Sequence, residues 1–197
     1  MKSPLIALAF TAALAAAPVQ AAPKLSFDIA GAPASSATAS VSPTLCFGCF
    51  ANTQLSSSLD AQIFDLGTGE SKTFDFFTIT VGGLGKALVD VSATLAFDLP
   101  PDETAEGSGS GFFATLFGVV SGGKLIWQDI PVITLADGSS FSVDFSDILA
   151  FGIGNSATVR ATVTALNVAE PVPEPAAIAL LGLGALGLGL RRRYRLS

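Results

Sequence analysis

The sequence predicts an all-β fold, an antiparallel β-sandwich of jelly-roll-like or immunoglobulin-like topology. Apolar and polar residues alternate with a period of two along several runs, as in strands with one buried face. Short glycine-containing sequences separate these runs, and no interior stretch has the period of a helix. We expect a single domain, because about 150 residues are enough to bury one core.

The first half of the domain contains one weak and one strong strand pattern. Residues 31–44 are small and rich in Ser and Thr, so we expect an exposed linker there; a weak strand and an O-glycosylated segment are the alternatives. Residues 74–81 alternate but change parity at Phe76-Phe77. This change predicts a strand that carries a β-bulge.

The middle of the domain predicts two strands joined by a loop. Residues 89–97 place Val, Ala, Leu and Phe on one side and polar residues on the other. Residues 100–111 are rich in Pro, Gly, Ser and acidic residues, which is typical of a long flexible loop. Residues 112–120 are apolar at almost every position and therefore predict a central strand.

The last third predicts a hairpin and one more strand. Asp137-Gly138 is a turn signal between the runs 132–135 and 141–145, which makes this the clearest hairpin of the chain. Residues 158–165 alternate Val and Ala with Thr and Arg. Three further turns are expected, at Gly67-Thr68-Gly69, Gly82-Gly83 and Ser121-Gly122-Gly123.

The N-terminus has the parts of a secretory signal peptide. Lys2 supplies the positive start, residues 5–17 the apolar core, and Val19-Gln20-Ala21 a cleavage site with small residues. We expect a signal helix over residues 1–21 that a signal peptidase removes.

The C-terminus has three parts in a fixed order. Pro173, Glu174 and Pro175 form an extended spacer, because proline fixes its own φ and keeps the residue before it out of the helical region. Residues 176–190 carry no polar side chain and predict a short transmembrane helix. Positive residues stay cytoplasmic, so the final basic cluster sets the membrane topology and places the β-domain across the membrane. That cluster is Arg191, Arg192, Arg193 and Arg195.

This tail resembles the PEP-CTERM sorting signal of bacterial surface proteins. The resemblance implies that an exosortase, a membrane transpeptidase-like enzyme, recognises Pro173, Glu174 and Pro175 and removes the tail. It also implies export across the inner membrane of a Gram-negative-type bacterium, transient anchoring, and then a cell-surface or extracellular location. A permanent tail anchor is the alternative. We therefore expect a signal peptide at 1–21, a β-sandwich domain at 22–170 and a PEP-CTERM sorting or anchor segment at 171–197.

The chain between the signal peptide and the apolar tail helix is strongly acidic. Five basic side chains stand there against all sixteen acidic ones, which leaves a net charge near −11. Such a surface repels phosphate backbones, so we expect no nucleic-acid partner. It would stay soluble in a polysaccharide matrix.

Cys46 and Cys49 form a C-x-x-C motif. A redox-active pair of this kind caps a helix, but β-type sequence surrounds this one, and two cysteines alone cannot complete a zinc site. An exported protein meets oxidising conditions, so we expect a short structural disulfide.

The chain contains no histidine. This absence removes Ser-His-Asp and Cys-His mechanisms and every metal site that needs an imidazole. We expect no catalytic residue, no metal site and no cofactor.

Carboxylates remain as candidates for chemistry. A two-carboxylate glycoside hydrolase needs two acids that face each other, and nothing in the spacing selects a pair. The candidates on strands and loops are Asp90, Asp98, Asp129, Asp144 and Asp147. Calcium binding by acidic residues of the loop is an alternative, although they show no EF-hand or RTX-like spacing. These are Asp102, Glu103 and Glu106.

Sugar-binding platforms usually use Trp or Tyr. The chain has one tryptophan, Trp127. Its one tyrosine, Tyr194, belongs to the tail. We therefore disfavour an aromatic-platform lectin and expect Trp127 in the core or at a strand edge.

The sequence thus predicts a non-enzymatic, exosortase-sorted protein of the cell surface or extracellular matrix, associated with exopolysaccharide or biofilm. Its expected partners are signal peptidase, exosortase, extracellular polysaccharide and, before processing, the membrane. The alternatives are a carbohydrate- or cation-binding module with a defined ligand site and a two-carboxylate hydrolase.

Overall fold

The computed structural model describes residues 22–116, 119–150 and 155–170. These residues form nine antiparallel strands in one sheet and one short 3-10 helix, η1 (Leu59–Ala61). The strands are β1 (Leu25–Ile29), β2 (Ser36–Leu55), β3 (Ile63–Leu66), β4 (Ser71–Leu99), β5 (Glu103–Leu116), β6 (Val119–Trp127), β7 (Ile133–Thr134), β8 (Ser140–Phe145) and β9 (Ser156–Asn167). The all-β prediction is confirmed. The predicted signal helix and transmembrane helix lie outside the described residues.

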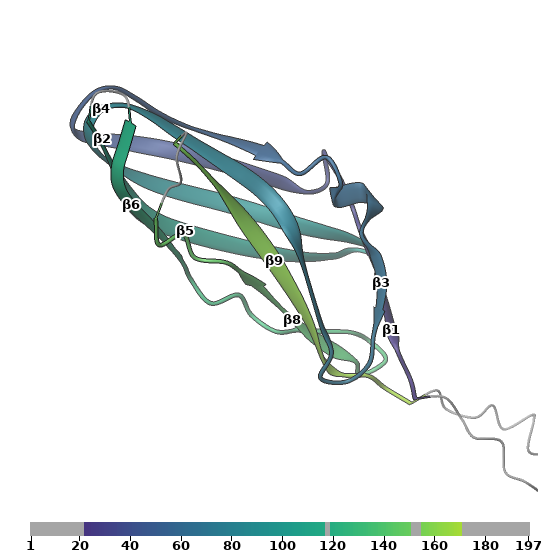
Figure 1. The fold of residues 1–197 in the computed structure, drawn as a ribbon. Coiled ribbons are helices and arrows are strands. Elements are labelled where there is room, and N and C mark those ends of the chain that lie inside the picture. Colours follow the sequence, from purple (N-terminus) through teal and green to yellow (C-terminus); the bar gives the residue numbers. More distant parts are fainter. Residues whose placement is uncertain (1–21, 117–118, 151–154, 171–197) are drawn as a thin grey trace, which may run out of the picture.

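The sheet becomes a sandwich because its two longest strands fold back on themselves. β2 and β4 pair with each other along most of their length. The Thr53 hydroxyl donates to the Ala37 carbonyl at 2.6 Å, so the two ends of β2 lie side by side. Figure 1 shows the β2–β4 ribbon turning over at one end of the molecule. Strands that change layer through a bend are a known way to make the corner of a sandwich.

Each layer contains one half of this ribbon. The first layer combines the end of β2 and the start of β4 with β9, β8 and β7. The second layer combines the start of β2 and the end of β4 with β5 and β6. β1 and β3 extend the sheet from the last residues of β4.

Both ends of the described domain lie together, opposite the corner (Figure 1). Leu25 pairs with Leu66, and the Val168 N–H donates to the Thr68 hydroxyl at 3.1 Å. β9 runs from the corner to this end through Ser156–Asn167. At about 3.3 Å per residue its length is about 36 Å.

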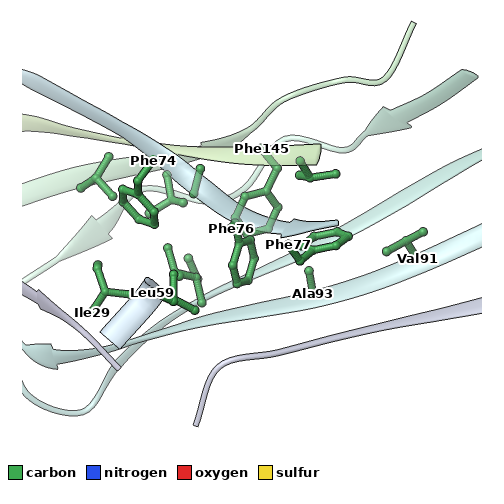
Figure 2. Close-up of a cluster of buried hydrophobic side chains, with 14 of the residues drawn as sticks. Ile29, Leu59, Phe74, Phe76, Phe77, Val91, Ala93 and Phe145 are labelled. Atoms are coloured by element: carbon green, nitrogen blue, oxygen red, sulfur yellow. The ribbon is translucent and has the colours of Figure 1, made fainter. Parts of the chain in front are cut away.

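A core rich in phenylalanine fills the space between the layers (Figure 2). Phe76 and Phe77 of β4 are completely buried and lie near Val91 and Ala93 of the same strand's second half. Trp127 packs edge-on against Phe77, with ring centroids 6.1 Å apart. Each buried phenylalanine contributes about 1.5–3 kcal/mol of apolar transfer free energy, so this cluster is the main source of stability.

Several strand predictions are confirmed. The pairing register shifts between Asp75 and Phe77, so the predicted bulge exists and turns both Phe76 and Phe77 inward. The hairpin around Asp137-Gly138 joins β7 to β8. The alternating runs of β8, β9 and the second half of β4 bury their apolar residues as expected.

Two predicted loops are strands instead. Residues 31–44 are no linker, because β2 begins at Ser36 and pairs in register with β4 from Thr94 to Ala87, so the alternative of a strand is the one that the structure shows. The flexible loop expected over residues 100–111 is mostly β5. Its glycines serve packing: a Cβ at Gly107 would lie 2.6 Å from the Phe145 ring, and one at Gly109 would lie 3.1 Å from Trp127.

The glycine-based boundaries around the corner were also wrong. Gly82-Gly83 bends β4 without ending it, and Ser121-Gly122-Gly123 lies inside β6. The central strand expected at 112–120 is divided, because β5 ends at Leu116 and β6 begins at Val119. Within the described ranges, no helix is long and apolar enough to cross a membrane.

Candidate functional site

A row of hydroxyl pairs covers the outer face of β4 and β9. Serine and threonine side chains of the two strands hydrogen-bond to each other across the strand pair. The pairs are Ser71–Thr164 at 2.9 Å, Thr73–Thr162 at 2.9 Å, Thr78–Thr158 at 3.5 Å and Thr80–Ser156 at 2.9 Å. We call these eight residues the hydroxyl face. Outward residues of a strand recur about every 6.6 Å, so the pairs form a regular ladder.

The bulge at Phe76-Phe77 makes this ladder possible. Without the extra residue, strict alternation from Thr73 would turn Thr78 inward. The bulge buries two consecutive phenylalanines and returns Thr78 and Thr80 to the outer face.

One ion pair lies in the middle of the hydroxyl face. Arg160 Nε donates to Asp75 Oδ1 at 3.0 Å, and both side chains are more than half exposed. An exposed pair of this kind contributes less than about 1 kcal/mol. The pair borders a polar hollow of about 490 Å³, whose other lining residues are Ser58, Gln62, Thr73 and Phe74. The two charges cancel, so the centre of the face is neutral although the domain is acidic.

Polar residues continue this face onto the neighbouring strands. On β2, Gln54 pairs in register with Thr78 and Asn52 with Thr80. On β8, Ser142 and Asp144 pair in register with the last threonines of β9. The result is a broad surface of hydroxyl and amide groups, each able to donate and accept hydrogen bonds.

The second distinctive region is the corner of the β2–β4 ribbon. Cys46 and Cys49 form the predicted disulfide within the bend of β2. Gly83 and Gly85 face it from β4, each with φ near +117°. A Cβ at Gly83 would lie 2.7 Å from Cys49 Sγ, and one at Gly85 would collide with the Leu45 carbonyl oxygen. Only glycine allows the two bent backbones to approach this closely.

Large apolar side chains are exposed around this bend. Six of the eleven exposed large apolar residues in the described ranges belong to β2, β4 or β5 near the corner. They are Leu45, Phe47, Phe50, Leu84, Leu88 and Phe112, which we call the apolar corner. Phe47 has 84% of its surface exposed. A hollow of about 270 Å³ opens beside them, lined by Thr44, Lys86, Ala87, Leu88 and Phe112.

Neither the hydroxyl face nor the apolar corner was predicted from the sequence. The alternation over 158–165 predicted a half-buried strand without a role for its polar face, and residues 112–120 were predicted as a central strand that is apolar on both faces. The sequence did contain a signal for the corner. Apolar residues surround the C-x-x-C motif, and the strand opposite it carries glycines, which have no side chain to bury them.

The candidate carboxylates are dispersed, with one exception. Asp90 and Asp144 lie exposed on outer faces, Asp129 is exposed after β6, and Asp147 accepts a hydrogen bond from the Trp127 backbone N–H at 3.0 Å. The exception is Asp98, which lines a hollow of about 430 Å³ together with the loop acids Asp102 and Glu103. Glu106 lies exposed on β5.

The described residues contain no group of three or more His, Cys, Asp or Glu side chains that could hold a metal ion.

Trp127 lies at the edge of the core, as predicted. Its ring makes edge contacts with Phe77 and Phe145, with the Phe145 centroid at 5.0 Å. Its indole N–H is buried and has no hydrogen-bond partner among the described residues. The ring is therefore not a platform for a sugar.

The residues with a predicted sorting or topology role lie outside the described ranges. They are Pro173, Glu174, Pro175, Arg191, Arg192, Arg193 and Arg195, and their roles remain predictions.

Comparison with known proteins gives one match, and it falls on this tail. Residues 171–193 match the family model of the PEP-CTERM protein-sorting motif. No curated protein and no solved structure matches the chain significantly. The motif implies export, processing by an exosortase and a surface or extracellular destination, and the recognition of this tail from its sequence is confirmed.

Proposed function

We propose that this chain is a non-enzymatic protein of the cell surface or extracellular matrix, whose β-domain binds extracellular polysaccharide. A signal peptidase removes residues 1–21 on export from a Gram-negative-type bacterium. The membrane holds the tail until an exosortase acts at Pro173, Glu174 and Pro175. The sorting-motif match supports the delivery, and the hydroxyl face supports the polysaccharide partner.

The hydroxyl face is chemically suited to a polymer of sugars. Serine and threonine hydroxyls both donate and accept hydrogen bonds, as sugar hydroxyls do. Its four pairs repeat along the strands, so one chain of a polysaccharide can bridge several of them. Each contact is weak, and affinity comes from their number along one polymer.

A non-enzymatic role is supported by the side chains available for chemistry. The chain has no histidine, and the carboxylates nearest to one another are mostly exposed around an open hollow. Exposed carboxylates without a shaped subsite are typical of a solubilising surface.

Binding is tested with exported protein and extracted exopolysaccharide in a pull-down assay. Replacing Thr73, Thr78, Thr158 and Thr162 by valine keeps the side-chain shape and removes two hydroxyl pairs. The expected result is a lower bound fraction. Thr38→Val with Thr104→Val, two exposed positions in the other layer, is the matched control and should bind like the wild type. Equal retention of the face variant and the wild type would reject the polysaccharide partner.

Sorting is tested separately by the mature mass in cells with and without the exosortase. We expect the tail to be absent only when the exosortase is present. An unchanged mass that still includes residues 176–195 would contradict processing, whatever the result of the pull-down.

A further inference from the structure

The apolar corner carries an inference that is independent of polysaccharide binding. Its six residues belong to β2, β4 and β5 near the bend of the β2–β4 ribbon, which lies at one end of the molecule (Figure 1). Contiguous exposed apolar patches on a soluble domain mark interaction sites. The disulfide between Cys46 and Cys49 fixes the loop that presents Phe47, and this lowers the entropy lost on binding.

The charges around the corner indicate the chemistry of its partner. The parts of β2, β4, β5 and β6 nearest to it, residues 41–55, 76–89, 107–116 and 119–127, contain only two charged side chains. These are Lys86 and Lys124, in a domain whose other charges are mostly acidic. Neither lysine forms an ion pair within the described ranges. The nearest acidic residue along β4 is Asp90, which directly follows this part of the strand.

Both lysines border the apolar residues. Lys124 pairs in register with Phe112, which pairs with Leu88 on its other side. Lys86 pairs with Leu45 and lines the hollow beside the corner. Exposed aromatic and aliphatic side chains with a basic rim are typical of proteins that lie on a membrane surface.

We propose that the apolar corner docks on an anionic lipid surface. Phe47, Leu45 and Leu84 enter the boundary between headgroups and acyl chains, while Lys86 and Lys124 contact the anionic headgroups. The anionic lipid surface repels the acidic remainder of the domain, so only the apolar corner contacts the membrane.

Two other occupants fit less well. In a two-fold contact between copies, each corner would meet the same surface on its partner, so the lysines of both copies would be brought close together. The chain's own tail fits less well by charge, because residues 176–190 carry no charged side chain and the arginines that follow them would be repelled by Lys86 and Lys124.

The test places a tryptophan reporter at the corner. Trp127 is the only native tryptophan, so Phe47→Trp adds a single exposed probe, here to the protein exported by cells without the exosortase, which keeps its tail. Ile63→Trp is the matched control, because Ile63 of β3 is 71% exposed and away from the corner. Both variants are mixed with vesicles of phosphatidylglycerol and phosphatidylcholine in equal amounts, with bromine on the acyl chains as a quencher.

The proposal predicts loss of the added emission for Phe47→Trp and none for Ile63→Trp. Vesicles of phosphatidylcholine alone should quench less, and Lys86→Gln and Lys124→Gln should each weaken binding about fivefold. Equal quenching of the two probes would assign vesicle binding to the tail and overturn the proposal. Unquenched emission from Phe47→Trp would also overturn the proposal. A blue shift that depends on protein concentration in the absence of vesicles would overturn it too, because it would indicate that a second copy covers the corner.

Discussion

The hydroxyl face and the apolar corner share strand β4, yet they leave opposite chemistry exposed. On the hydroxyl face, each polar side chain has a partner across the strand pair. At the corner, six large apolar side chains keep 43–84% of their surface exposed. The hydroxyl face forms because the bulge at Phe76-Phe77 inserts one residue into β4. The corner forms because Gly83 and Gly85 have no side chain, so the two backbones can approach closely.

In these two regions, the residues that stabilise the fold differ from the residues available for binding. The backbone of the corner tolerates little change, because strands touch there, whereas its exposed side chains contribute little to folding. The side chains of the hydroxyl face are interchangeable for folding as long as their shape is kept. Four variants test this contrast, from the largest expected effect to the smallest.

Gly85→Ala should break the corner. The new Cβ would collide with the Leu45 carbonyl oxygen at a φ near +117°, which an L-residue rarely adopts. We expect a loss of about 4 kcal/mol in the free energy of unfolding, measured by denaturant titration. Gly122→Ala, where nothing lies within 4 Å, is the control and should cost less than about 1 kcal/mol. Similar losses in both variants would show that the close approach is unimportant.

Replacing Cys46 and Cys49 by serine together should have a smaller effect. The two residues are three positions apart, so the disulfide closes a very short loop and removes little entropy from the unfolded chain. The loop-entropy estimate is about 2 kcal/mol. The measurement is the denaturation midpoint of the double variant against the oxidised wild type. A loss similar to that of Gly85→Ala would mean that the disulfide, and not the glycines, holds the bend.

Thr73→Val with Thr162→Val should change stability by less than about 1 kcal/mol. Both partners of one hydrogen bond are replaced by residues of the same shape, so no polar group is left without a partner. Thermal unfolding followed by circular dichroism gives the difference. The single variant Thr73→Val leaves Thr162 unpaired but exposed enough to bond water, and should resemble the double variant. A cooperative loss in the double variant would give the ladder a structural role.

Phe47→Ser should leave the free energy of unfolding within about 0.5 kcal/mol of the wild type. Its side chain is 84% exposed, so folding buries little of it. The same denaturant titration measures it, and solubility should rise. A loss above about 1 kcal/mol would mean that Phe47 packs into the domain, which would remove the main anchor of the apolar corner.

The period-two pattern was sufficient to predict the strands that bury one face. The pattern predicted β8, β9 and the bulged start of β4 directly, because their inward residues are apolar and their outward ones polar. The pattern failed where glycine acts by packing. In β5, Gly107 and Gly109 leave room for the rings of Phe145 and Trp127, contacts that come from distant parts of the chain.

The candidate site was less predictable for a similar reason. The sequence contains each serine and threonine of the hydroxyl face, but their pairing depends on the register between β4 and β9, about 90 residues apart. The tail, in contrast, is read locally, since its spacer, apolar run and arginines follow one another directly. Its motif was therefore recognisable from sequence alone.

The register of the β2–β4 ribbon also sets an order for folding. Leu55 and Phe77 form its innermost pair, 22 residues apart, and Ser36 and Thr94 its outermost, 58 apart. Closing the shorter loop costs less entropy, and each pair formed brings the next within reach. We therefore expect the ribbon to zip outward from Leu55 and Phe77 through the corner, so that the second layer is laid down on a first layer that already exists.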